Sequence, residues 1–143
     1  MASWTNARAQ AIAQGIMADA DNVFPGGAQV VIYDGTAPAN ADASLSGNTL
    51  LAQLAMSDPP FLDSPGDISP GYQITADTIT DDASANASGT PTFARVLNSL
   101  GVCVLQFSVG GTGSGAEGII VPSTITSGQP VAMTSLTITV PEA

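Results

Sequence analysis

The first 27 residues differ in pattern from the rest of the chain. Residues 3–22 are rich in Ala and Gln and contain no proline, and FPGG at 24–27 follows them. Trp4, Ile12 and Ile16 recur near helical spacing, and Ala or Arg8 fills the positions between them. This pattern predicts one α-helix that ends at 24–27. Because the apolar stripe is narrow, the helix needs a surface to lie against, either its own domain or a partner.

From residue 28 the pattern changes to short runs that are β-branched or that alternate between apolar and polar residues. The expected strands are residues 28–35, 48–56, 72–79, 91–99, 102–110, 118–124 and 135–140. The proline-containing stretch 57–71 is expected to be an extended loop. Since no helical pattern lies between the strands, the sequence predicts an all-β fold: an antiparallel β-sandwich or jelly roll of seven to eight strands with one N-terminal α-helix.

The chain of 143 residues has the usual length of one domain and contains no repeat of the kind that builds solenoids. No linker divides it. We therefore expect an N-terminal helical arm at residues 1–27 and a β-sandwich domain at residues 28–143.

Alternation assigns side chains to the faces of the expected strands. Three sets are each expected to share one face: Leu50, Ala52, Leu54 and Met56; Cys103, Leu105, Phe107 and Val109; and Leu136, Ile138 and Val140. In this scheme Cys103 is a small core residue. No histidine is present to act as its base, so we do not expect it to be a nucleophile.

Arg95 stands out within its strand. It shares a face with Phe93 and Leu97, while Ala94 and Val96 lie on the opposite face. A guanidinium between apolar neighbours must be paired or must lie at an interface. Two partners are open to it, an internal Asp and a carboxylate of a second subunit, and alternation alone does not tell which face points inward.

Charge excludes several classes of function. The chain has twelve acids, two arginines, no lysine and no histidine, for a formal net charge of -10. Binding to nucleic acid or to an anionic membrane needs cationic side chains, so neither partner is expected. Without histidine or lysine the usual general bases are missing, and we expect no enzyme activity and no cofactor.

Charged residues make up only 10% of the chain, so its surface must be largely neutral. Such a surface suits extensive contact with neighbouring proteins, since few charges lose water on contact. The alternative to such an assembled protein is an acidic soluble monomer. No apolar run reaches the length of a membrane span, the N-terminus lacks the pattern of a secretory signal, and a single cysteine forms neither an internal disulfide nor a metal cluster.

Two motifs have simple structural interpretations. Residues 113–118 match G-x-G-x-x-G, but a strand pattern follows where a dinucleotide fold opens a helix, so we expect a flexible hairpin loop. Side-chain oxygens are closely spaced at Asp19, Asp21 and Asn22 and again at Asp81 and Asp82, but the further ligands of a calcium loop are missing. We expect solvated acids there and no metal site.

Two long segments carry a family resemblance. VVIYDGTAPANADASLSGNTLLAQLAMSDPPF (30–61) and GTPTFARVLNSLGVCVLQFSVGGTGSGAEGIIV (89–121) resemble stretches of small structural proteins of tailed bacteriophages. With the Thr-rich final strand, the likeness covers most of residues 28–140. In size and all-β character the chain is also similar to the jelly-roll cement proteins that decorate some phage heads.

The resemblance implies a virion protein whose partners are the phage major capsid protein and further copies of itself. It would lie on the outer surface of the capsid, after a stay in the host cytoplasm before assembly, and would bridge capsid subunits. The expected interface residues are Trp4, Arg8, Ile12, Ile16 and Arg95. A tail or baseplate protein is the alternative, and a glycan-binding module is a further one, for which the chain offers Trp4, Tyr33 and Tyr72 as stacking platforms.

Overall fold

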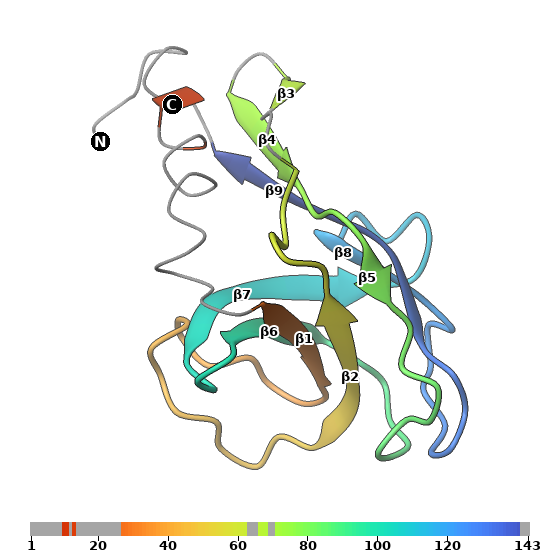
Figure 1. Ribbon diagram of the computed structural model, residues 1–143. Coiled ribbons are helices and arrows are strands. Elements are labelled where there is room, and N and C mark those ends of the chain that lie inside the picture. Colours follow the sequence, from red (N-terminus) through yellow and green to blue (C-terminus); the bar gives the residue numbers. More distant parts are fainter. Residues whose placement is uncertain (1–9, 12, 14–26, 63–65, 69–70, 141–143) are drawn as a thin grey trace.

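The computed structural model describes residues 10, 11, 13, 27–62, 66–68 and 71–140. This part of the chain is all-β, as the sequence predicts (Figure 1). Its strands are β1 (Ala28–Tyr33), β2 (Leu50–Met56), β3 (Gly66–Asp67), β4 (Tyr72–Thr75), β5 (Ile79–Thr80), β6 (Phe93–Asn98), β7 (Cys103–Gly110), β8 (Gly118–Val121) and β9 (Ala132–Val140).

The described strands form one sheet in the order β3-β4-β9-β8-β7-β6-β1-β2-β5. The prediction of seven to eight strands is wrong, because the stretch 57–71 contains β3 and the run 72–79 divides into β4 and β5. The prediction of a purely antiparallel sheet is also wrong, because β7 and β8 are parallel. All other pairs are antiparallel, and a sandwich of two facing sheets is not confirmed.

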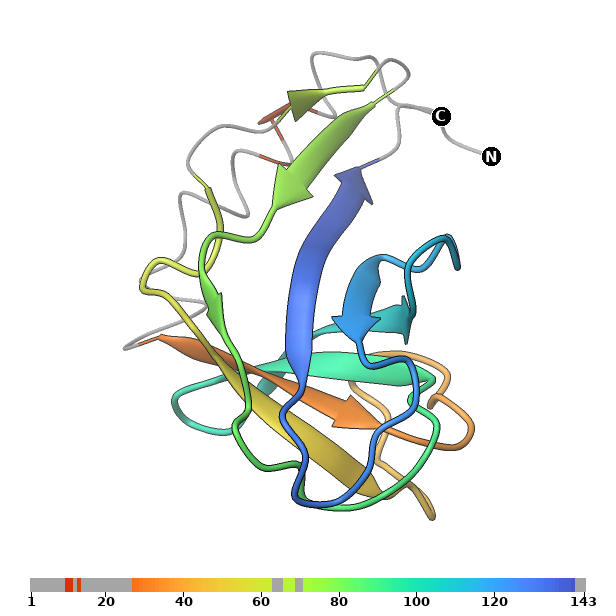
Figure 2. The same cartoon turned by 90° about the vertical axis from the view of Figure 1, so that its right-hand side faces the viewer.

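The sheet curls because its strands change partners along their length (Figure 2). The first half of β9 pairs with β8 and the second half pairs with β4. After β4 the chain stays beside β9, where the Ala76 N–H donates to the Leu136 carbonyl, and then β5 pairs with β2. Asp82 and Val131 next exchange both of their backbone hydrogen bonds. The segment 72–82 therefore joins the two ends of the curled sheet.

The main core lies inside this curl. Its most deeply buried members come from β1, β2, β4, β6, β8, β9 and the loops that close the sheet: Val30, Ile32, Leu51, Ala52, Leu54, Ile74, Ala94, Val96, Ile120, Ile125, Val131 and Leu136. Leu136, Ile138 and Val140 all contribute to this core, as their alternation predicts. Ala94 and Val96 also point into it, so Phe93, Arg95 and Leu97 occupy the outer face of β6.

Two irregularities move predicted core residues to that outer face. Between β1 and β2 the register passes from Ile32↔Ala52 to Tyr33↔Leu50, so Leu51 enters the core in place of Leu50. Between β6 and β7 the register passes from Val96↔Leu105 to Leu97↔Cys103. A one-residue bulge reverses the face of the side chains beyond it. Leu50 and Cys103 are therefore outside the main core, contrary to the sequence-based expectation.

Almost all of the predicted N-terminal helix lies outside the described residues. Within 3–22 the structure describes Gln10, Ala11 and Ala13, whose backbone is helical. Ala13 is fully buried and belongs to the main core. Among the described residues of the arm, Ala13 contacts the β-domain.

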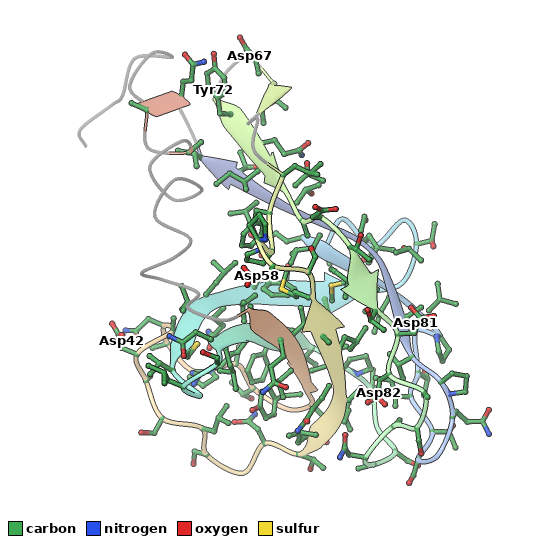
Figure 3. All side chains as sticks on the ribbon, viewed as in Figure 1. Asp42, Asp58, Asp67, Tyr72, Asp81 and Asp82 are labelled. Carbon is green, nitrogen blue, oxygen red and sulfur yellow. The ribbon has the colours of Figure 1, made fainter. Side chains whose placement is uncertain are left out.

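The carboxylate of Asp82 gives a direct test of how the sheet closes. Its two oxygens accept the N–H groups of Gln53 on β2 and of Ser84, each at 2.9 Å, whereas Asp81 is exposed (Figure 3). Asp82→Ala should lower the free energy of unfolding by about 1–2 kcal/mol because two donors lose their acceptor. Asp81→Ala, the matched control, should change it by less than about 0.5 kcal/mol. Urea denaturation of dilute protein measures both, and equal effects would contradict this role of Asp82.

Candidate interaction site

The loop between β1 and β2, residues 34–49, is the most distinctive feature of the outer surface. Irregular loops longer than about 12–15 residues are uncommon in compact domains and usually have a function. This loop crosses the outer face of the sheet and is fastened to side chains of β6 and β7 (Figure 1). We call residues 34–49 the anchored loop.

A small apolar cluster lies on the outer face of β1 and β6. Val31, Tyr33 and Phe93 are buried there, and Leu50 and Leu97 pack against them. The rings of Tyr33 and Phe93 stack with centroids 5.4 Å apart. Offset stacking of this kind stabilises a sheet face beyond simple burial. The cluster gives the outer face of the sheet a small core of its own.

Arg95 fastens the middle of the anchored loop. Its side chain is only 6% exposed. Nη2 donates to the carbonyl oxygens of Ala43 at 2.6 Å and Asn40 at 3.4 Å, while Nε donates to Gln106 Oε1 at 3.0 Å. Gln106 in turn donates from Nε2 to the Pro38 carbonyl at 2.8 Å. A planar guanidinium with several fixed donors can hold such a set of oxygens, which the ammonium of a lysine cannot.

The ends of the anchored loop are tied to each other. Asn48 Nδ2 donates to the carbonyl oxygens of Asp34 at 2.9 Å and Thr36 at 3.0 Å. The Thr49 N–H donates to the Asp34 carboxylate at 2.6 Å. At the centre, the Asn40 side chain accepts the N–H of Ala43 at 2.9 Å, which fixes a turn. The side chains of Asp34, Asn40 and Asn48 thus serve the loop's own conformation.

The outward side of the loop is nearly free of charge. Its exposed residues are Thr36, Ala37, Ala39, Asn40, Asp42, Ser44, Leu45, Ser46, Gly47 and Thr49 together with Gly35. Among them Asp42 is the charged residue, at the side of the molecule in Figure 3. A rigid, neutral surface loses little hydration energy and little conformational entropy when another protein covers it. This arrangement can bind a protein surface.

Of the predicted interface residues, the structure describes Arg95. Trp4, Arg8, Ile12 and Ile16 lie outside the described residues. Arg95 bonds to carbonyl groups and to Gln106 of its own chain, and among the described residues no Asp is paired with it. Its assignment to an interface stays a prediction. The roles of Gln106 and the loop were missed, although the long gap between the expected strands 28–35 and 48–56 marks the loop.

The glycine-rich segment 113–118 lies in the connection from β7 to β8 and ends as β8 begins, so no helix opens there. Gly113 and Gly115 have φ values of 81° and 77°, which favour glycine. The connection leads to a parallel neighbour, not to the hairpin partner expected. So short a connection can lead to a parallel strand because β7 and β8 pair only at Val109–Gly110 and Gly118–Ile119.

Three acids in the described part of the chain bind backbone N–H groups through their side chains. Asp34 and Asp82 accept N–H groups as above, and Glu117 Oε2 accepts the Ser108 N–H at 3.0 Å. No group of three or more potential ligands within the described residues is placed to hold a metal ion. Asp19, Asp21 and Asn22 lie outside those residues. No described helix is long and apolar enough to cross a membrane.

No family model, curated protein or solved structure matches the chain.

Replacing Arg95 should release the anchored loop. Arg95→Met removes a charged donor from the Ala43 carbonyl and from Gln106, and should lower the free energy of unfolding by about 2–4 kcal/mol. Arg95→Lys keeps the charge but not the planar set of donors, so its effect should be intermediate. Urea denaturation gives the stability, and hydrogen exchange should show faster exchange in residues 38–44. Unchanged exchange in Arg95→Met would contradict the anchoring role.

The thiol of Cys103 should be slow to react. Burial raises its pKa, and the nearby Arg95 guanidinium offsets part of this effect. Labelling with a disulfide reagent at pH 8 should be slower in the folded than in the urea-unfolded protein, since less thiolate is present. Above the ordinary thiol pKa of about 8.5, the unfolded chain loses its proton first, so stability should fall as pH rises there. Equal labelling rates would contradict this environment.

Proposed function

We propose that the chain is a non-enzymatic structural protein of a tailed-phage virion and, more narrowly, a decoration or cement protein of the capsid. In this proposal it binds the outer surface of the head and bridges subunits of the major capsid protein. The observation that carries the proposal is the anchored loop, a fixed and nearly uncharged surface on a chain with a net charge of -10.

Charge supports the outer surface as the place of binding. Packaged DNA repels a strongly acidic chain, so binding to the inner surface of the head would be unfavourable. The anchored loop meets a protein shell without a large desolvation cost, since Asp42 is its one exposed acid. Many weak contacts on a closed lattice then act together, and binding to the assembled shell stabilises it by mass action.

Jelly-roll cement proteins place two sheets face to face, whereas here one sheet curls, and the segment 72–82 pairs with β9 through β4 and with β2 through β5. The curled sheet would serve the same purpose as the two sheets of a jelly roll, because it is a compact body that carries binding loops. The N-terminal helix with Trp4, Arg8, Ile12 and Ile16 would serve as an assembly arm, and copies of the chain would form a homo-oligomer.

The alternative is a tail or baseplate protein, because tails are also built from small β-domains in repeating arrays. The glycan-binding alternative is less favoured. Sugar sites use exposed aromatic rings, but Tyr33 and Tyr72 are both buried in this fold. Trp4 lies outside the described residues.

Binding to particles tests the proposal. Purified protein added to phage particles that lack it should appear by cryo-electron microscopy on the outer surface of the head. Leu45→Asp in the anchored loop should weaken this binding at least about tenfold, because it places an acid at the centre of the contact. Leu62→Asp, a matched change of an exposed leucine outside the loop, should not. Binding should change only modestly with salt.

Density on the tail or baseplate would replace the cement proposal with its alternative. Binding to host-cell glycans without binding to particles would overturn both. Substrate turnover that is lost when one aspartate is replaced would show that the chain is an enzyme.

A further inference from the structure

The anchored loop begins with an Asp-Gly pair. Asp34 and Gly35 directly follow β1, and no other Asp or Asn in the sequence is followed by Gly. Such a pair rearranges without an enzyme, because the main-chain nitrogen of the second residue attacks the carboxyl carbon of the first and glycine has no Cβ to hinder the approach. Asp34 is half-buried and Gly35 is exposed, so water reaches the pair.

The rearrangement conserves every atom of the chain. The Gly35 nitrogen bonds to Asp34 Cγ, and one carboxyl oxygen leaves as water with the amide hydrogen and the acid proton, which gives a five-membered succinimide. Water then adds to one of the two ring carbonyl carbons and breaks its bond to the Gly35 nitrogen. Opening at Cγ restores aspartate. Opening at the main-chain carbon gives isoaspartate, in which the main chain runs through Cβ and Cγ and the former peptide carbon becomes a free carboxylate.

The fold holds the carboxyl group that would be attacked. The Thr49 N–H, at the other end of the anchored loop, donates to Asp34 Oδ1 at 2.6 Å. Hydrogen bonds to a carboxylate are among the stronger ones in proteins. This bond therefore fixes the orientation of the Asp34 side chain for as long as the two ends of the loop stay together.

The fold also holds the peptide groups on both sides of Gly35. Asn48 Nδ2 donates to the carbonyl oxygens of Asp34 at 2.9 Å and Thr36 at 3.0 Å. Thr92 Oγ1 donates to the Gly35 carbonyl at 2.6 Å. The amide of Asn48 also closes the space beside Gly35, where a Cβ would lie 3.1 Å from Nδ2. These contacts fix Gly35 at a φ of 77°.

We call the side chains of Asn48 and Thr92, together with the Thr49 N–H, the clamp. Ring closure requires the clamp to open. To reach Cγ, the Gly35 nitrogen must turn with its peptide group, and this turn moves the Asp34 carbonyl away from Asn48. A reaction that proceeds from a locally opened state has a rate proportional to the population of that state. The hydrogen bonds of the clamp therefore set the rate of this chemistry.

We propose that Asp34-Gly35 is a site of isoaspartate formation that the clamp protects in the folded protein and that reacts when the end of the anchored loop detaches. Isomerisation makes the detachment permanent. The carbonyl that Asn48 binds becomes part of a carboxylate, and the carboxyl group that Thr49 binds becomes part of the main chain, so the same clamp does not re-form. The inference does not depend on the proposed function.

Incubation of the protein at physiological pH and temperature tests the site. Mass spectrometry with electron-transfer fragmentation distinguishes isoaspartate from aspartate at a given residue. Residue 34 should isomerise at least about tenfold faster in urea-unfolded than in folded wild-type protein. Asp34→Glu should show no isomer at this position in either state, because glutamate does not close a five-membered ring.

Variants of the clamp test its role in the folded protein. Asn48→Ala removes two of its hydrogen bonds and should raise the rate at least about threefold. Thr92→Val keeps the shape of the side chain but loses the bond to Gly35, and should also raise the rate. Asn40→Ala is the matched control in the same loop, since the side chain of Asn40 bonds to the N–H groups of residues 42 and 43. It should isomerise as slowly as wild type.

Three results would overturn the inference: no isoaspartate at residue 34 in the unfolded protein, equal rates in folded and unfolded wild type, or equal rates in Asn48→Ala and Asn40→Ala. Circular dichroism shows whether each variant is folded. If Asn48→Ala does not fold, Thr92→Val decides, and a rate equal to that of wild type would overturn the role of the clamp. Because unmodified protein is used for particle binding, the proposed function and this inference succeed or fail separately.

Discussion

The hydrogen bonds that Arg95 donates to the carbonyl groups of residues 40 and 43 organise the outer side of this protein. Burying a guanidinium is costly unless its donors are satisfied, so the outer face of β6 requires a layer of oxygen atoms above it. The anchored loop supplies that layer, with Gln106 beside it. The loop needs the cation for its shape, and the cation needs the loop for its burial. A long segment without strands becomes a fixed surface by this means.

Much of the fold is predictable from the sequence because short apolar runs and turn residues are local signals. The all-β class, the hairpin at Leu100-Gly101 and the core face of β9 follow from them. The bulges at Leu51 and Val104 were not predictable, since a bulge depends on the partner strand and not on the run itself. The same applies to the parallel pairing of β7 and β8, which leaves no mark in either strand.

The candidate site was predictable only in part. The sequence drew attention to Arg95 and placed it correctly on a face with Phe93 and Leu97, but the expected partner was a carboxylate. Its actual partners are backbone carbonyl groups of a distant loop. Because every residue has a carbonyl group, sequence composition carries no signal for such a partner. Gln106 was hidden for the same reason: a neutral amide on a strand acquires a role only when the register sets it opposite Arg95.

The order of the strands has a consequence for aggregation. The sheet ends in β3 on one side and β5 on the other, and each has only two residues. Short edge strands are one of the means by which natural proteins prevent open sheet edges from pairing with another chain. Such pairing is a particular danger for a protein with few charged residues when many copies are crowded together. With both terminal strands this short, extension of the sheet from β3 or β5 would find little backbone on which to start.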